Sequence, residues 1–99
     1  MERANQTNTH PGKILKEDVI EANSLSIGKA AELLALSRFT LYKIANGKGA
    51  ITPNIALRIE VVFGGSTDFW LSMQRGYDLI EERIRFSNNP PGLTHFDDN

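Results

Sequence analysis

An all-α fold built around a helix-turn-helix is predicted by three features of the sequence. In residues 26–47, apolar side chains recur at helical spacing on two short segments. They are Ala30, Ala31 and Leu34 on the first segment, and Leu41 and Ile44 on the second. Ser26 and Ser37 each precede one segment and can cap it by accepting a bond from a free backbone N–H. Asn46 and Gly47 end the second helix, since glycine adopts the left-handed conformation without strain.

Three further helices complete the expected fold, and their ends are marked by proline, glycine and hydroxyl residues. One precedes the helix-turn-helix at residues 11–21, and two follow it, at 53–63 and from 67 to about 85. Pro11 and Pro53 suit the first helical position, because the missing N–H of proline costs nothing there. The fold class is therefore all-α with five helices.

The length of 99 residues predicts one domain with two short tails. We expect a flexible arm at residues 1–9, the helical domain at 10–86 and an irregular tail at 87–99. The chain has no cysteine, which excludes disulfides and thiolate zinc sites. No apolar run approaches the roughly 20 residues of a membrane span, and no signal peptide is recognisable. We expect a cytoplasmic protein without a membrane partner, metal or cofactor.

Charge is unevenly distributed along the chain. The net charge is −1, but residues 24–49 carry four cations and one anion. A basic patch on an acidic body is compatible with DNA binding. Two copies would double the phosphate contacts, which favours a dimer.

The sequence has no nucleophile–base pair, metal cluster or phosphate-cradling loop, so an enzyme is not expected. His10 is expected to cap or pack, whereas Asp78 could anchor a helix end or a subunit contact.

The outward side chains of the second short helix form a polar and aromatic set suited to base edges and phosphates. They are Arg38, Phe39, Thr40, Tyr42 and Lys43. Phe39 lies outside the apolar face, where it could contact a thymine methyl group or fold back on the domain. Gly28 interrupts the first short helix at a cost of about 1 kcal/mol relative to alanine.

The chain resembles the HigA-type antitoxins, a branch of the Xre/phage-repressor-like helix-turn-helix family. The resemblance covers roughly residues 10–79. It is carried by HPGKIL (10–15), SIGKAAELLALS (26–37), NGKGAIT (46–52) and ALRIEVVFGGSTDFWLSMQRGYDL (56–79). It implies a five-helix lambda-repressor-like DNA-binding domain and a homodimer that binds a palindromic operator in its own promoter. It also implies an antitoxin that neutralises a RelE-like mRNA-endonuclease toxin by direct binding.

The resemblance also implies which residues meet DNA. The outward residues named above would face the major groove, Asn46 would bond a phosphate, and Lys48 and Ser26 could add to that contact. The full predicted DNA-binding set is Ser26, Ser37, Arg38, Phe39, Thr40, Tyr42, Lys43, Asn46 and Lys48. Two departures from the family pattern matter. Ile27 replaces a phosphate-binding glutamine, and Ala35 replaces the turn glycine, where a left-handed backbone would cost roughly 1 kcal/mol.

The fifth helix is apolar over more of its circumference than one small core needs, which predicts a dimer interface. The residues expected there are Phe69, Trp70, Met73, Tyr77 and Ile80. Two other functions stay open: a helix-turn-helix regulator without a toxin partner, and a toxin-binding module that has lost DNA binding. The toxin surface is also open, between the N-terminal arm with the first helix and the C-terminal tail.

Overall fold

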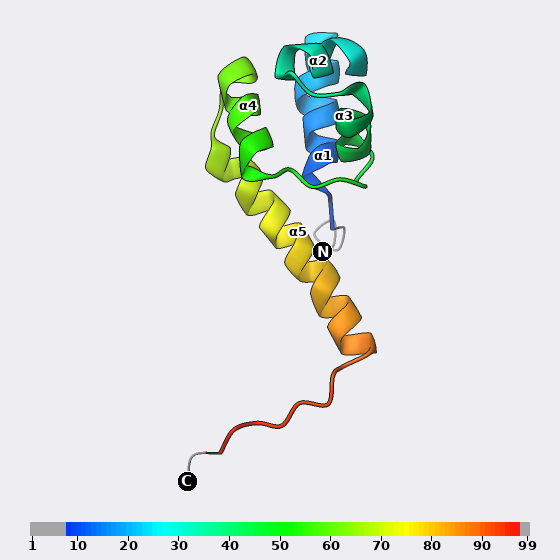
Figure 1. The fold of residues 1–99 in the computed structure, drawn as a ribbon, viewed down its shortest axis with the longest axis vertical. Helices are drawn as coiled ribbons and strands as arrows, with labels where there is room; N and C mark the ends of the chain where they lie inside the picture. Colours follow the sequence, from blue (N-terminus) through cyan, green and yellow to red (C-terminus); the bar gives the residue numbers. More distant parts are fainter. Residues whose placement is uncertain (1–7, 98–99) are drawn as a thin grey trace, which may run out of the picture.

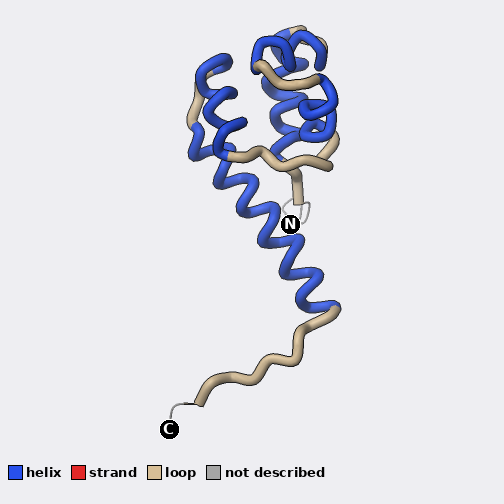
Figure 2. The backbone as a smooth tube through the Cα atoms, in the orientation of Figure 1, coloured by secondary structure: helices blue, strands red, loops and turns tan. Residues whose placement is uncertain are grey.

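Five helical segments and their connecting loops make up the computed structural model, which describes residues 8–97 (Figures 1 and 2). No strand occurs within that range. The elements are α1 (Pro11–Ile14), continued by η2 (Leu15–Ile20) and η3 (Glu21–Asn23), then α2 (Ile27–Leu34), α3 (Arg38–Ala45), α4 (Pro53–Phe63) and α5 (Thr67–Asn88). The predicted all-α, five-helix architecture is confirmed. The flexible arm predicted at 1–9 falls largely outside the described residues.

Side chains cap every helix start that the sequence marks. Each capping atom accepts a hydrogen bond from a backbone N–H in the first turn, which has no partner within the helix. The pairs are His10 Nδ1 with Gly12, Ser26 Oγ with Lys29, Ser37 Oγ with Thr40, Thr52 Oγ1 with Ile55, and Ser66 Oγ with Phe69, at 2.9–3.4 Å. Local chemistry therefore fixes where the helices begin.

The core lies where α1 and its continuation meet α2, α3 and α4. Its largest fully buried side chains are Leu15, Ile20, Leu34, Leu41, Ile44, Ile51, Ile59 and Pro11. At one point the backbones of α1 and α3 touch, because a Cβ placed on Gly12 would collide with the carbonyl of Ile44. Glycine is therefore required there for close packing against the second helix of the helix-turn-helix pair.

The last helix, α5, begins on the body and then leaves it (Figure 1). Its first half packs against α4 and buries Trp70 and Gln74. Its second half is mostly exposed and reaches Asn88, beyond the predicted end near residue 85. Residues 89–97 follow without helix or strand. Within the described part of the chain, no helix combines the length and apolarity needed to cross a membrane.

Candidate nucleic-acid interface

The outer surface of α3 carries the predicted DNA-facing residues. In Figure 1, α3 and α4 lie on opposite sides of the body, so the outer face of α3 is not covered by α4. Arg38, Tyr42 and Lys43 are exposed and Thr40 is half-buried, while Leu41 and Ile44 point into the core. The helix is thus divided into an inner apolar face and an outer face free to meet a partner.

Phe39 is 68% exposed, which places its ring on the surface and not folded back against the core. The Lys43 ammonium lies 5.2 Å from the centre of this ring, one helical turn further along. A cation in that position is attracted to the ring face by about 0.5–1 kcal/mol at an exposed site. Tyr42 is 59% exposed beside them. The surface of α3 therefore presents two aromatic rings and a cation.

Arg38 extends from the start of α3 back towards the start of α2. A Cβ placed on Gly28 would lie only 2.9 Å from the nearer terminal nitrogen of the Arg38 guanidinium. Glycine at this position therefore leaves room for the guanidinium against the first turn of α2. The positive end of a helix and a guanidinium together favour an anion such as a phosphate. From the sequence, Gly28 was predicted only to weaken its helix, and its contact with Arg38 was not foreseen.

The predicted phosphate-binding residue Asn46 takes part in ending α3. Its side-chain Nδ2 donates to the carbonyl of Tyr42 at 2.9 Å, which leaves one N–H of the amide for another acceptor. The next residues close the helix, as Gly47 adopts a φ of +75° and the N–H of Lys48 donates to the carbonyl of Lys43. Asn46 and the side chain of Lys48 are both exposed at this end of α3.

Ser26 and Ser37 are exposed, but both hydroxyl groups already serve the fold. Ser26 Oγ caps α2, and Ser37 Oγ caps α3 while donating to Thr40 Oγ1 at 2.8 Å. Both therefore position their helices as caps. Lys29 in the first turn of α2 forms an exposed ion pair with Glu32 at 3.5 Å, which offsets part of the positive charge near the two caps.

The loop that follows α3 is anchored by a buried residue that sequence reasoning missed. Gln74 is only 7% exposed, and its Oε1 accepts the N–H of Ile51 at 2.8 Å. Its Nε2 donates to Asp78 at 3.0 Å, so Asp78 supports a side chain of its own helix. The sequence did contain one signal for this buried residue, since the glutamine stands between two mostly apolar stretches, 69–73 and 77–80. This anchor fixes the path of the chain from α3 into α4.

His10 caps and packs, as predicted. Its Nδ1 holds the N–H of Gly12, and its ring meets the ring of Tyr77 edge-on at a centroid distance of 4.7 Å. Burial lowers the pKa of His10 below its ordinary value, and the nearby Asp78 carboxylate opposes that effect. The neutral imidazole is the form that accepts the N–H bond. His10 thereby joins the start of α1 to α5.

The predicted dimer residues divide into buried and open positions. Trp70 is 5% exposed and belongs to the core of the protomer, so its ring is not available to a second copy. Met73 and Tyr77 are half-buried, whereas Phe69 and Ile80 are exposed. Three further apolar side chains are exposed later on α5: Leu79, Ile84 and Phe86.

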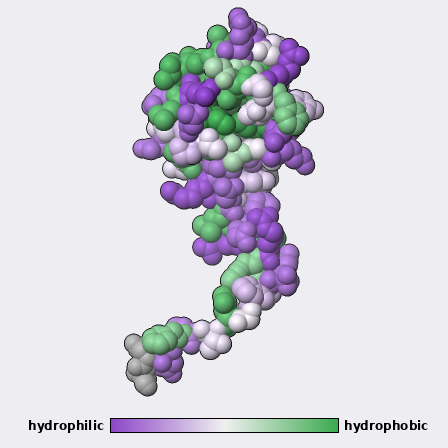
Figure 3. Space-filling model, in the orientation of Figure 1, coloured by the Kyte–Doolittle hydropathy of each residue, from purple (hydrophilic) through white to green (hydrophobic). Residues whose placement is uncertain are grey.

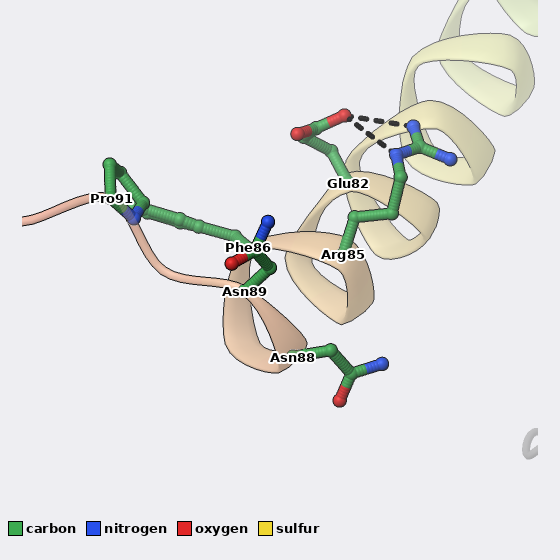
Figure 4. Close-up of a pocket in the computed structure, with 6 residues that line it drawn as sticks. All are labelled: Glu82, Arg85, Phe86, Asn88, Asn89 and Pro91. Atoms are coloured by element: carbon green, nitrogen blue, oxygen red, sulfur yellow. Dashed lines mark hydrogen bonds and ion pairs between the residues drawn. The ribbon is translucent and has the colours of Figure 1, made fainter.

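A hollow of about 570 Å³ lies where α5 meets the tail (Figure 4). In it, Arg85 donates from two nitrogens to Glu82 Oε1, at 2.8 and 3.2 Å, so these charges are paired. The other lining residues are Phe86, Asn88, Asn89 and Pro91. These groups form no acid–base pair. Across residues 8–97, no group of three or more His, Asp or Glu side chains could hold a metal ion.

Two short capped helices, joined by a left-handed turn and followed by an anchored loop, define a helix-turn-helix protein. No protein-family model matches the chain. The helix-turn-helix-type transcriptional regulator YbaQ of Escherichia coli K12 is 36% identical over 82% of this chain and 72% of that protein. A HigA-family addiction-module antidote from Coxiella burnetii is 30% identical, with a TM-score of 0.71 over 90% and 98% of the two chains. The chain belongs to the HigA family of addiction-module antidotes, as its sequence resemblance indicated.

A second similar structure is PA4674 from Pseudomonas aeruginosa, solved in complex with its operator DNA. It is 25% identical, with a TM-score of 0.78 over 85% of this chain and 92% of that one. YbaQ is thus named as a transcriptional regulator and the Coxiella protein as an antidote, while PA4674 is seen bound to its operator.

Proposed function

We propose that this chain is an antitoxin that represses its own operon by binding operator DNA through α3. The observation that carries the proposal is the exposed outer face of α3, which is held in place by Ser37 at its start and Asn46 at its end. Exposed aromatic rings offer apolar contact to thymine methyl groups, and cations offer contact to phosphates or guanine. The operator complex of the similar PA4674 protein supports the same use of this fold.

The proposed DNA contacts follow the geometry. Tyr42, Lys43 and the ring of Phe39 face base edges, while the guanidinium of Arg38, which lies against the start of α2, and Lys48 after α3 contact phosphates. Asn46 adds its free N–H to a phosphate. Ser26 and Ser37 contribute mainly as the caps that orient the two helices, and Thr40 is the partner of the Ser37 cap.

We also propose a homodimer that forms through the exposed apolar side of α5. Its exposed members are Phe69, Ile80 and Ile84, and the half-buried Met73 and Tyr77 lie between them on the same side of the helix. The charge pattern supports pairing, since two copies bring two basic surfaces to one duplex and double the phosphate contacts. A two-fold dimer also matches a palindromic operator.

The second proposed activity is direct neutralisation of a small toxin, of the RelE-like mRNA-endonuclease class that the family resemblance implies. Membership of the addiction-module antidotes supports a toxin partner, because an antidote acts on a cognate toxin. The neighbouring gene should therefore encode a small basic protein that copurifies with this chain.

One experiment tests both activities. The chain is co-expressed with the product of the adjacent gene and scored for rescue of growth, copurification and a shift of the promoter duplex. Arg38→Ala combined with Lys43→Ala should abolish the DNA shift at about 150 mM salt, while rescue and copurification persist. Sedimentation of the wild-type chain should give twice the protomer mass.

The matched control is Arg75→Ala with Arg83→Ala, which removes two exposed cations from α5 and should leave the DNA shift intact. An unchanged shift with the α3 variant would show that α3 is not the recognition helix. A DNA shift without any toxin partner would select the stand-alone regulator, and copurification without a shift would select the toxin-binding module.

A further inference from the structure

The turn between α2 and α3 has an unfavourable backbone conformation. Ala35, its first residue, has a φ of +56°, in the left-handed region that residues with a Cβ avoid. Two backbone bonds support the turn, from the N–H of Ala35 to the carbonyl of Glu32 and from the N–H of Leu36 to that of Ala31. The carbonyls of Leu34 and Ala35 lie beyond them, at the negative end of α2.

Arg58 of α4 donates to both of these carbonyls. Its Nη1 lies 2.7 Å from the oxygen of Ala35 and 3.0 Å from that of Leu34. Its Nε donates to Asn54 Oδ1 at 2.8 Å, which orients the guanidinium plane from the same helix. The two bonds to the carbonyls tie the turn to α4, although Ala35 and Leu34 are 23 and 24 residues from Arg58 in sequence.

The Arg58 side chain is half-buried between two helices, and its donor group is charged. Arg58 lies in a groove of about 310 Å³ between α2 and α4, whose apolar walls are Leu33, Leu57, Val61 and Val62. Figure 3 shows apolar side chains gathered over this part of the body, with polar residues over most of the projecting helix. Bonds from a charged donor are stronger than neutral ones, and a cation suits the C-terminal end of a helix.

The turn controls the direction of α3. Only Leu36 separates Ala35 from Ser37, the N-cap of α3, so the dihedral angles at Ala35 set the angle between the two helices. A recognition surface must be held within about 0.5 Å and 10–20° of its working geometry. A guanidinium fastened to the turn from α4 supplies such a restraint.

We propose that Arg58 is a positioning residue for DNA recognition, which fixes the α2–α3 turn and thereby the orientation of α3 without contacting DNA. The proposal rests on the DNA binding proposed above. It predicts that loss of the guanidinium weakens sequence-specific binding in a chain that remains folded, and that it leaves the number of phosphate contacts unchanged.

The test uses the full-length protein and a duplex that the wild-type chain selects from a random library. Arg58→Met keeps the apolar stem of the side chain and removes the donors. Its affinity for the selected duplex should fall about tenfold or more, with affinity for unselected DNA within about twofold of wild type. The slope of log affinity against log salt should stay the same, whereas loss of a phosphate contact would lower it by about 1.

Two variants separate positioning from general stability. Arg58→Lys keeps a charged donor and should retain most of the affinity. Ala35→Gly, introduced into Arg58→Met, should recover part of the lost affinity, because glycine holds the left-handed turn without help. The control Arg75→Met removes an exposed arginine of α5 and should not change affinity for the selected duplex. Circular dichroism at the assay temperature verifies that each variant is folded.

Four results would overturn the positioning role. They are an unchanged affinity in folded Arg58→Met, an equal loss on selected and unselected DNA, a reduced salt slope, or no recovery in either the lysine or the glycine variant. A wild-type chain that selects no duplex would overturn the proposed DNA binding together with this role. Selection by the wild type with unaltered binding by Arg58→Met would overturn this role alone.

Discussion

The bond between Gln74 and Ile51 provides a sharp test of how the loop after α3 is held. Gln74→Met replaces the amide with an apolar side chain of similar length, so the N–H of Ile51 loses its acceptor. Ile51 is 1% exposed, so water has little access to this group. An unsatisfied buried donor costs about 1–3 kcal/mol. The bond from Gln74 to exposed Asp78 adds little, and we expect a loss of about 2 kcal/mol.

For a domain of this size, each kcal/mol lowers the thermal midpoint by roughly 4–8 °C, so Gln74→Met should melt about 10 °C lower. Trp70, the single tryptophan, lies in the core and reports unfolding by its fluorescence. Denaturant titration should give a lower midpoint with an unchanged slope. Protein concentration is held constant, because dimerisation would link stability to it.

The control for this variant is Ser72→Met, which introduces the same side chain at an exposed position two residues earlier. Exposed substitutions of this kind usually change stability by less than about 0.5 kcal/mol. Equal midpoints for Gln74→Met and Ser72→Met would refute the reasoning, since the buried N–H would then have found another partner at no cost.

Two further predictions concern glycine and histidine. Gly28→Ala should raise the free energy of unfolding by about 0.5–1 kcal/mol, because alanine favours a helix more than glycine does. The flexible end of Arg38 can move aside for the new methyl group. A lower thermal midpoint would contradict this prediction. The free energy of unfolding should fall as the pH drops below about 6.5, the ordinary pKa of histidine, because the lowered pKa of His10 lets the unfolded chain bind a proton first. His10→Asn, which caps without titrating, should flatten this dependence in chemical denaturation between about pH 7.5 and 5.5; an equal slope for both proteins would exclude His10 as its source.

Local signals in the sequence located the helices accurately. A cap depends on one side chain and a backbone group two or three residues away, so Ser26, Ser37 and Thr52 could be recognised without knowledge of the fold. The left-handed turn at Ala35 was expected from the family resemblance, because the family places a glycine at this position. The structure has the expected positive φ there. What the sequence could not supply was the support for that turn, because Arg58 reaches it from another helix.

The candidate DNA surface could likewise be predicted from the sequence only in part. Helical spacing separated the outward residues of α3 from Leu41 and Ile44, and burial confirms that division. Spacing could not say that the guanidinium of Arg38 lies against Gly28, or that Asn46 bonds its own helix, because those contacts depend on how α2 and α3 cross and end. It also placed Trp70 at a dimer surface, whereas packing of α5 on the body buries its ring.

By itself, the sequence determined the helical class, the helix starts and the side of α3 that faces outward, because each depends on residues close together in the chain. Tertiary structure decided which polar groups hold the recognition helix in place. Gln74 is 23 residues from Ile51, and Gly12 meets the carbonyl of Ile44 across two packed helices. Such contacts arise only when distant segments are brought together, and no local periodicity encodes them.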